Sequence, residues 1–416
     1  MRTTNRRRWL VSALGLLALP CAAALALAQD APPPGPQPAP PAKPDEGAKT
    51  DEGAKTGDGT KTGEGDPSDG DGAKADPEPQ PSGDTDPGEV VLTRPRLVSA
   101  EVERSIEKAV AWLARHQGRD GSFREGGQGM GSAYPTAMTG LAGMAFLGHG
   151  DTPTRGRYAN NVRRCVRFLL DPKMARRSGL ITSPGEEGRS MYGHGFSTMF
   201  LACCLGETGD PELERRLKVV LTGAVQLIGR SQSKLGGWYY SPQDQSDEGS
   251  VTVTQVQALR ACQHAGIGVP QKVIQEAVRY IEKSANKDGG ISYTAQSPGS
   301  SMPAISAAAC AVLYNAGQYD SPMAKRCLAY VRKTFRAGDT SGFGHWFYAH
   351  LYLSQAYWQS GPQDFDAYYK ATSEHLRRTQ ASDGSWEGDG VGRIYGTAIG
   401  TTILSLPYER IPLYMR

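Results

Sequence analysis

The sequence predicts an all-α fold of helical hairpins for residues 96–416. Three observations predict it. Apolar residues recur at helical spacing, a short turn motif returns at intervals of about 46 to 59 residues, and strand-like alternation is scarce. The expected helices form six outer and inner pairs, which suggests two concentric layers closed into a ring. An open solenoid is the alternative arrangement.

Residues 1–28 have the pattern of a secretory signal peptide. Three arginines, Arg6 to Arg8, precede an almost uncharged run that ends in the small-residue pattern Ala26-Leu27-Ala28. We therefore expect cleavage, export to the periplasm or cell surface, and a mature chain that does not span the membrane. A single membrane anchor is the alternative, because the run is about long enough to cross a bilayer. The arginine pair leaves Sec and Tat export both open.

Residues 29–95 are rich in Pro, Gly, Asp, Lys and Thr and nearly lack apolar side chains. Such a segment cannot bury enough surface to offset its chain entropy, so we expect a disordered linker. The net charge of +3 and the lack of a dense basic stripe argue against a nucleic-acid partner.

Six of the seven cysteines lie in apolar, helix-like runs, and no Cys-x-x-Cys occurs. Helix-interior cysteines are more often buried side chains than disulfides, so we expect thiols and no zinc site. Disulfides are the alternative in an exported chain.

The turn motif follows each expected outer helix. Three copies share an apolar residue, a glutamine four residues on, a glycine four further and an aromatic two further: WLARHQGRDGSF, LIGRSQSKLGGW and LRRTQASDGSW. YIEKSANKDGGISY keeps the register without the glutamine and the aromatic, and two degenerate copies lie near Gly179 and Gly342. The glycine supplies the left-handed residue that ends a helix. The best copies contain Gln117 and Phe123, Gln232 and Trp238, and Gln380, Gly384 and Trp386.

The two layers differ in composition. The helices before the turns have one apolar face, as in Val102, Ile106, Val110 and Leu113, which predicts an outer, half-exposed layer. The segments after the turns carry few charges and many small residues, which predicts a crowded inner layer. They span residues 134–148, 192–206, 250–266, 302–317, 344–361 and 395–406.

The Gln-x-x-x-Gly-x-Trp pattern resembles the QW repeat of squalene–hopene and oxidosqualene cyclases. Their fold is shared by the beta subunits of protein prenyltransferases. Over residues 100–416 the chain looks like a secreted, planctomycete-type member of the prenyltransferase and squalene oxidase repeat family. The resemblance implies an (α/α)6 toroid with a central cavity that ligands enter where the inner helices begin. It also implies that the repeated Gln, Gly and aromatic residues tie outer helices together rather than act in catalysis.

The family's catalytic motifs are not preserved. Cyclases use an Asp in D-x-D-D at the start of an inner helix, and the matching segment here, SDEGSVTVTQ, has Asp247 beside Glu248. Asp247 is a candidate general acid; a helix N-terminal carboxylate favoured by the helix dipole is the alternative. The prenyltransferase zinc ligands are also missing, because Gly249 stands where their cysteine would be. His194 is a second catalytic candidate, with a satisfied turn histidine as its alternative.

Aromatic and polar residues at the starts of the inner helices are candidates to line the cavity. They are Tyr192, Trp238, Tyr240, Ser250, His345 and Tyr348. They suit an apolar, isoprenoid-like ligand, with terpenoid cyclase or prenyltransferase activity as a further hypothesis and no cofactor. The alternative is a non-catalytic binding or scaffold protein of the periplasm or cell surface.

Overall fold

The computed structural model describes residues 94–125, 134–315, 318–336 and 345–415. The expected signal peptide, nearly all of the expected linker and the degenerate turn near Gly342 lie outside these residues. The described part contains twelve α-helices, and its β-pairing is limited to three isolated bridges. No helix in the described ranges is long and apolar enough to cross a membrane.

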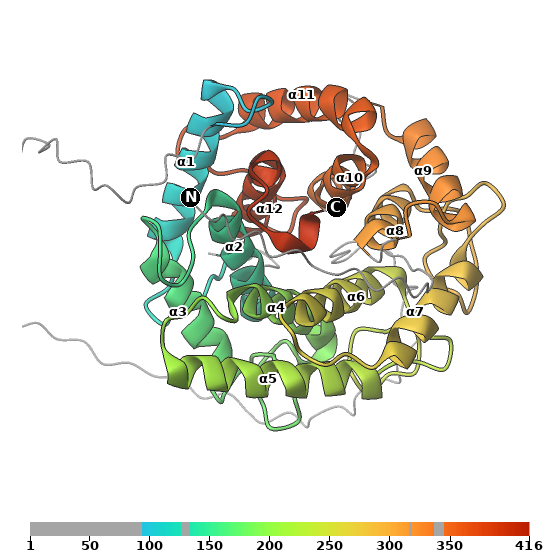
Figure 1. Cartoon of the computed structure of the whole chain (residues 1–416), viewed down its shortest axis with the longest axis horizontal. Helices are drawn as coiled ribbons and strands as arrows, with labels where there is room; N and C mark the ends of the chain where they lie inside the picture. The colour runs from blue at the N-terminus through green and yellow to red at the C-terminus, as the bar shows by residue number, and fades with distance from the viewer. Residues whose placement is uncertain (1–93, 126–133, 316–317, 337–344, 416) are drawn as a thin grey trace, which may run out of the picture. The chain divides into compact units, whose positions relative to one another are not determined.

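The helices form two concentric layers, as Figure 1 shows. The outer layer consists of α1 (Ala100–His116), α3 (Ala159–Leu170), α5 (Pro211–Arg230), α7 (Gln271–Ser284), α9 (Pro322–Thr334) and α11 (Pro362–Thr379). The inner layer consists of α2 (Pro135–His149), α4 (Ser190–Cys204), α6 (Gly249–His264), α8 (Pro303–Asn315), α10 (Trp346–Ser360) and α12 (Arg393–Ser405). Each inner helix packs against the next one around the ring, and α12 packs against α1 and α2. The ring is therefore closed, and the prediction of an (α/α)6 toroid is confirmed.

The inner helices are buried on nearly every face because they carry small residues. All of α2 except His149 is buried. At Gly140 a Cβ atom would lie 2.8 Å from the backbone of Phe196, so glycine is what allows α2 and α4 to approach so closely. This close approach explains the Gly, Ala, Ser and Thr content of the inner segments.

The turn motif joins neighbouring outer helices. Gln380 Nε2 donates to the carbonyl of Gly384 in its own turn and to that of Ser105 in α1, both at 2.9 Å. Gly384 has φ +99°, and its Cα faces the Lys108 carbonyl of α1 so closely that a Cβ would lie 2.5 Å from that oxygen. The last turn is therefore tied to the first helix of the ring.

The other full copies repeat this geometry. Gln117 Nε2 reaches the Asn161 carbonyl of α3 at 3.0 Å, and Gln232 Nε2 reaches the Val273 carbonyl of α7 at 2.9 Å. The indole nitrogens of Trp238 and Trp386 each donate to a carbonyl of the preceding outer helix at 2.8 Å. Phe123, which has no such donor, is fully buried in the corresponding turn.

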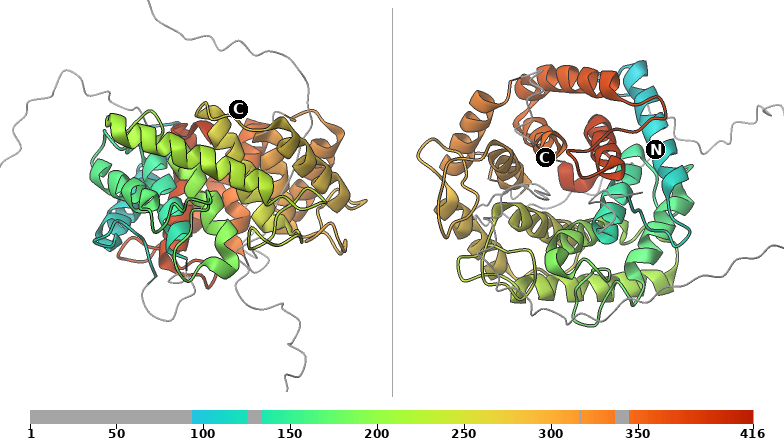
Figure 2. Two further views of the ribbon diagram at one scale, coloured as in Figure 1. Left: turned by 90° about the horizontal axis from the view of Figure 1, so that it is seen from below. Right: turned by 180° about the vertical axis from the view of Figure 1, so that it is seen from behind.

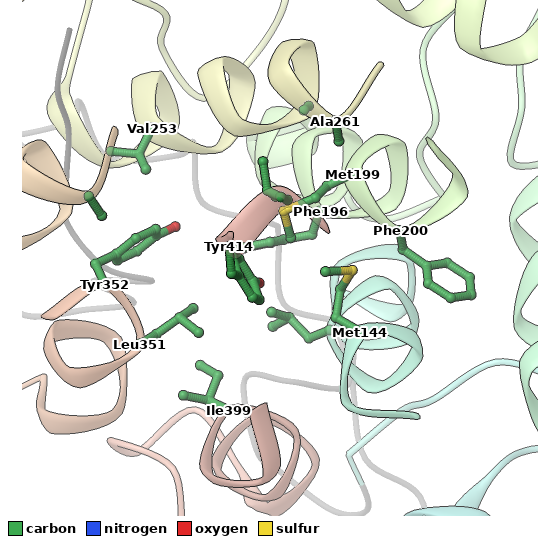
Figure 3. Packing of buried hydrophobic residues seen from close by; sticks show 14 of the residues in the cluster. Met144, Phe196, Met199, Phe200, Val253, Ala261, Leu351, Tyr352, Ile399 and Tyr414 are labelled. Carbon is green, nitrogen blue, oxygen red and sulfur yellow. The ribbon is translucent and has the colours of Figure 1, made fainter. Parts of the chain in front are cut away.

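The chain ends inside the ring. After α12, the short 3-10 helices η4 (Leu406–Tyr408) and η5 (Pro412–Tyr414) lead to the C-terminus, which lies near the middle of both face-on views (Figures 1 and 2). Tyr414 lies among apolar side chains of the inner helices, including Met144, Met199 and Leu351 (Figure 3). The C-terminal segment is thus part of the apolar core at the end of the ring where the inner helices end.

Candidate functional site

Two tyrosines from successive repeats meet where α4 and α6 begin. Tyr240 and Tyr293 each stand four residues after a turn glycine. The Tyr240 carbonyl accepts from Met191 N at 3.0 Å, and the Tyr293 carbonyl accepts from Gly249 N at 2.9 Å. Their hydroxyl oxygens lie 2.6 Å apart. The turn geometry, repeated once, therefore brings both side chains to the same end of the ring.

Glu248 lies behind these tyrosines and caps α6. Its carboxylate accepts from the amides of Ser250 and Val251 at 2.9 and 3.0 Å. The hydroxyl groups of Tyr192, at 3.1 Å, and of Ser250 also contact it. The side chain is completely buried.

Burial raises the pKa of Glu248 to about 8 although four hydrogen-bond donors favour its charged form. The carboxyl is therefore mainly protonated at neutral pH. The same burial raises the pKa of Tyr192 well above its usual value, with the nearby Glu248 as the next cause. Both groups are uncharged at pH 7, and neither has surface to offer a substrate.

Asp247, the predicted general acid, is also buried. Its Oδ1 accepts from Thr294 Oγ1 at 2.8 Å and from Ala295 N at 2.9 Å. The two adjacent carboxyl groups therefore have different partners: Glu248 holds its own helix, and Asp247 holds the loop that leads to α8. This geometry favours a structural role for Asp247, but in holding a loop. The helix-capping role that was the alternative interpretation of Asp247 belongs to Glu248.

His194 belongs to a repeated structural hydrogen bond. Its Nδ1 accepts from Ile181 N at 3.1 Å. In four other repeats a hydroxyl oxygen does the same for the second residue after the turn glycine: Thr139 for Phe123, Thr252 for Trp238, Ser306 for Ile291 and Thr397 for Trp386. Burial lowers the pKa of His194 to about 4. It is a neutral, fully buried acceptor, as expected for a residue that fixes a turn.

The remaining ligand-binding candidates are divided among several places. Tyr192, Tyr240 and Ser250 lie together around Glu248. Trp238 is fully buried beneath them. His345 precedes α10 and Tyr348 lies in its first turn, packed edge-on against Tyr352 at 4.8 Å. Because α10 packs between α8 and α12, these two residues belong to another sector of the ring.

The accessible part of the site is a tyrosine–arginine cluster, formed by Arg189, Tyr239, Tyr240 and Tyr293. All four side chains keep part of their surface exposed. The Arg189 guanidinium lies 4.5 Å from the centre of the Tyr240 ring, and the Tyr239 ring lies 4.4 Å from it. The sequence interpretation missed Arg189 and Tyr293. The register shared by Tyr293 and Tyr240 could have revealed the second of these.

Within the described residues, no three His, Cys, Asp or Glu side chains come together as metal ligands. No disulfide joins the six cysteines of this part of the chain, and five of them are buried.

The fold is similar to that of several carbohydrate-active proteins. An inactive variant of an α-1,6-mannanase from Salegentibacter sp. HEL1_6, in complex with α-1,6-mannotriose, has a TM-score of 0.53 and 9% identity. The match covers 74% of this chain and 99% of that one. A GH76 α-mannanase of Bacteroides thetaiotaomicron has a TM-score of 0.54 and 9% identity, covering 75% and 97% of the two chains. A D-mannose isomerase has a TM-score of 0.52 and 16% identity, covering 77% and 100%.

At such low identity, these matches show a shared α/α toroid and nothing finer. Neither a protein-family model nor a curated protein matches the chain in sequence. The toroid implied by the QW-like repeat is therefore shown, whereas membership of the cyclase and prenyltransferase family stays a prediction.

Proposed function

We propose that this chain is a non-catalytic carbohydrate-binding toroid that uses the tyrosine–arginine cluster as its binding site. The observation that carries the proposal is the part-exposed group of Tyr239, Tyr240 and Arg189, at the end of the ring where inner helices begin. The Tyr239 ring lies 4.4 Å from the Tyr240 ring and is tilted to it by 47°, and the Arg189 guanidinium lies 4.5 Å from the centre of the Tyr240 ring. Aromatic faces attract the weakly positive C–H groups of a sugar ring, and the hydroxyl and guanidinium groups beside them bind sugar hydroxyls.

The distribution of apolar surface favours a sugar over an isoprenoid. An isoprenoid needs an apolar cavity, and a side chain lining such a cavity would keep accessible surface. The central side chains Met144, Met199 and Leu351 are only 1%, 2% and 4% exposed. The part-exposed groups where α4 and α6 begin are instead hydroxyl-bearing rings and a cation. The carbohydrate-active proteins with this fold add support at the level of the fold alone.

Binding without hydrolysis is supported by the carboxylates. The inactive mannanase variant carries asparagine in place of two successive aspartates. This chain also has two successive carboxylates, Asp247 and Glu248, but they are only 2% and 0% exposed. Both are engaged by backbone and hydroxyl donors, and glycoside hydrolysis needs carboxyl groups that reach the glycosidic bond.

The N-terminal sequence fits a role outside the cytoplasm. A signal peptide over residues 1–28 would export the chain. Polysaccharides of the envelope and of the surroundings would be available there.

Affinity electrophoresis of the exported full chain in gels containing α-1,6-mannan, a β-glucan or soluble peptidoglycan tests the proposal. Retardation by at least one polysaccharide is expected, and Tyr239→Ala should weaken it by about tenfold or more. Tyr319→Ala is the matched control, because Tyr319 is also half-buried and stacked, on Tyr314 at 5.0 Å, but follows α8.

Three results would contradict the proposal. Absence of retardation in every gel excludes polysaccharide binding. Release of reducing sugar shows catalysis. Co-purification of an isoprenoid that is lost in Tyr239→Ala would favour the earlier hypothesis of an isoprenoid-binding site.

A further inference from the structure

A hollow lies in another sector of the ring, away from the tyrosine–arginine cluster. It has a volume of about 550 Å³ and lies between the start of α10, the end of α11 and the turn that leads to α12. Trp346, Phe347, His375, Thr379, Trp386 and Arg393 form most of its wall. Its volume falls within the range of about 300–1,000 Å³ that is usual for small-molecule sites.

The hollow coincides with a departure from the repeat. One position of the outer helices lies five residues before the turn glutamine or its equivalent. In α1, α5 and α7 this position holds a large buried residue: Trp112, Leu227 and Tyr280, which are 3%, 7% and 0% exposed. In α11 this position holds His375, which is only half-buried. A bulky buried residue is thus replaced by a smaller, polar one where the cavity lies.

The wall of the hollow combines aromatic surface with uncharged polar groups. The Trp346 ring lies 4.7 Å from the His375 ring. The Phe347 ring meets the Trp346 ring edge-on at 5.0 Å. Burial, and then the nearby Arg378, lower the pKa of His375, so its imidazole is neutral at pH 7 and can both donate and accept. Thr379 lies on the same wall, and its hydroxyl donates to the His375 carbonyl at 2.9 Å.

The charges at the rim are balanced. Arg393 pairs with Asp383 and lies 3.7 Å from Glu387, so its guanidinium is already matched by carboxylates. A free anion would gain little here. A neutral ligand with an apolar ring face and several hydroxyl groups fits the aromatic wall, the imidazole and the fixed charges.

We propose that this hollow is a second saccharide subsite, which takes a short, neutral oligosaccharide. The inference rests on the proposed carbohydrate-binding function. It adds a separate binding site at α10, α11 and α12, across the ring from the tyrosine–arginine cluster at the starts of α4 and α6. Two such sites on one ring would let the protein hold a glycan chain at two points and would raise its affinity for long chains over short ones.

His375→Tyr tests the subsite, because it fills the hollow with the residue that α7 has at this position. Binding of α-1,6-mannotriose, cellotriose and diacetylchitobiose to the full chain is followed by calorimetry and by tryptophan fluorescence. We expect at least one of these probes to bind, and His375→Tyr to weaken it about tenfold or more without lowering the melting temperature. Trp346→Phe should reduce the fluorescence response. His264→Tyr is the control, because it makes the same substitution at an exposed histidine at the end of α6, in another sector of the ring.

The outcomes separate the two proposals. Loss of the probe in His375→Tyr but not in Tyr239→Ala supports the subsite. Loss in Tyr239→Ala with full binding in His375→Tyr overturns the subsite and leaves the proposed function standing. A wild-type chain that binds polysaccharide but none of the three probes also overturns the subsite, and a chain that binds no glycan overturns both.

Discussion

The two ends of the ring are held together by different forces. Where the inner helices begin, buried carboxylates, hydroxyls and backbone amides form a network of directed hydrogen bonds. Where the inner helices end, the C-terminal segment fills the centre with apolar side chains. The first end leaves tyrosines and an arginine part-exposed. The second buries Leu413 and Tyr414, although Tyr408 and Arg410 are half-buried there. The proposed binding sites lie at the hydrogen-bonded end, and the buried apolar centre of the other end contributes stability.

At the hydrogen-bonded end, acidic residues act as caps. Within the described residues, carboxylates bind the first amides of four inner helices: Glu125 on α12, Glu186 on α2, Glu248 on α6 and Asp389 on α10. Helix N-termini attract negative charge, and an unpaired buried amide is costly. The acidic residues at this end of the ring are thus explained by helix capping, and their presence there does not require a catalytic role.

The largest expected effect is on the apolar end. Tyr414→Ala should lower the free energy of unfolding by about 3–5 kcal/mol, because it removes a buried aromatic ring from the centre of the ring. Tyr414→Phe, which keeps the ring, should cost much less. Urea denaturation of the full chain measures both. A loss below about 1 kcal/mol for Tyr414→Ala would mean that the C-terminal segment is not part of the core.

A somewhat smaller effect is expected at the hydrogen-bonded end. Glu248→Ala removes the cap of α6 and leaves the amides of Ser250 and Val251 without their acceptor, at a cost of about 2–4 kcal/mol. Glu248→Gln should cost less than about 1 kcal/mol at pH 7, because an amide resembles the protonated acid.

The pH dependence sharpens this comparison. The pKa of Glu248 is raised to about 8 by burial, so its favourable contribution is complete below pH 4.5 and is lost as the pH rises through 8. The stability of Glu248→Gln relative to the wild type should therefore improve between pH 6 and 9. Denaturation curves at several pH values measure this difference, and a constant difference would show that Glu248 is already ionised at pH 6.

The ring could be predicted well from the sequence because the repeated residues make the same structural contacts in each copy. Gln380 and Gly384 recur in register, and the same contacts with the next outer helix recur with them. The site was harder to predict, because single residues carry it. His194 looked catalytic as a lone histidine, but its role becomes clear only when Thr139 and Thr252 are seen to do the same task.

Long-range pairing limited the rest of the prediction. Nothing local in the sequence shows that Tyr240 and Tyr293 touch, or that Asp389 caps α10 from a distant turn. The burial of individual side chains could not be predicted from the sequence either. Asp247 and Glu248 read as a possible acid pair, whereas their exposure depends on loops that fold over them.

An intermediate effect is expected at the seam of the ring. Gln380→Ala removes two hydrogen bonds, to Gly384 and to Ser105 of α1, and should cost about 1–3 kcal/mol. Gln232→Ala breaks the matching pair between α5 and α7 and should cost about the same. Gln363→Ala, on the exposed face of α11, is the control and should stay within about 0.5 kcal/mol. A Gln380 effect no larger than this control would show that the seam is closed by packing alone.

The smallest expected effect comes from a group of charged side chains at the apolar end, centred on His149. Burial opposes charging of His149, but hydrogen bonds to Asp151 at 2.6 Å and to Glu107 at 3.0 Å outweigh it and raise its pKa to about 9. The cations Arg157 and Arg410 also face Glu107. The stabilisation is complete below pH 6.5 and is lost as the pH rises through 9, by on the order of 1–2 kcal/mol.

His149→Gln should therefore be less stable than the wild type at pH 6, and the difference should shrink towards pH 10. His264→Gln is the control, because burial lowers the pKa of His264, the opposite direction from His149. Thermal unfolding from pH 6 to 10 measures both variants. A stability difference between His149→Gln and the wild type that does not change with pH would show that His149 does not lose a proton in this range. Its ion pairs would then not contribute to the stability of the apolar end.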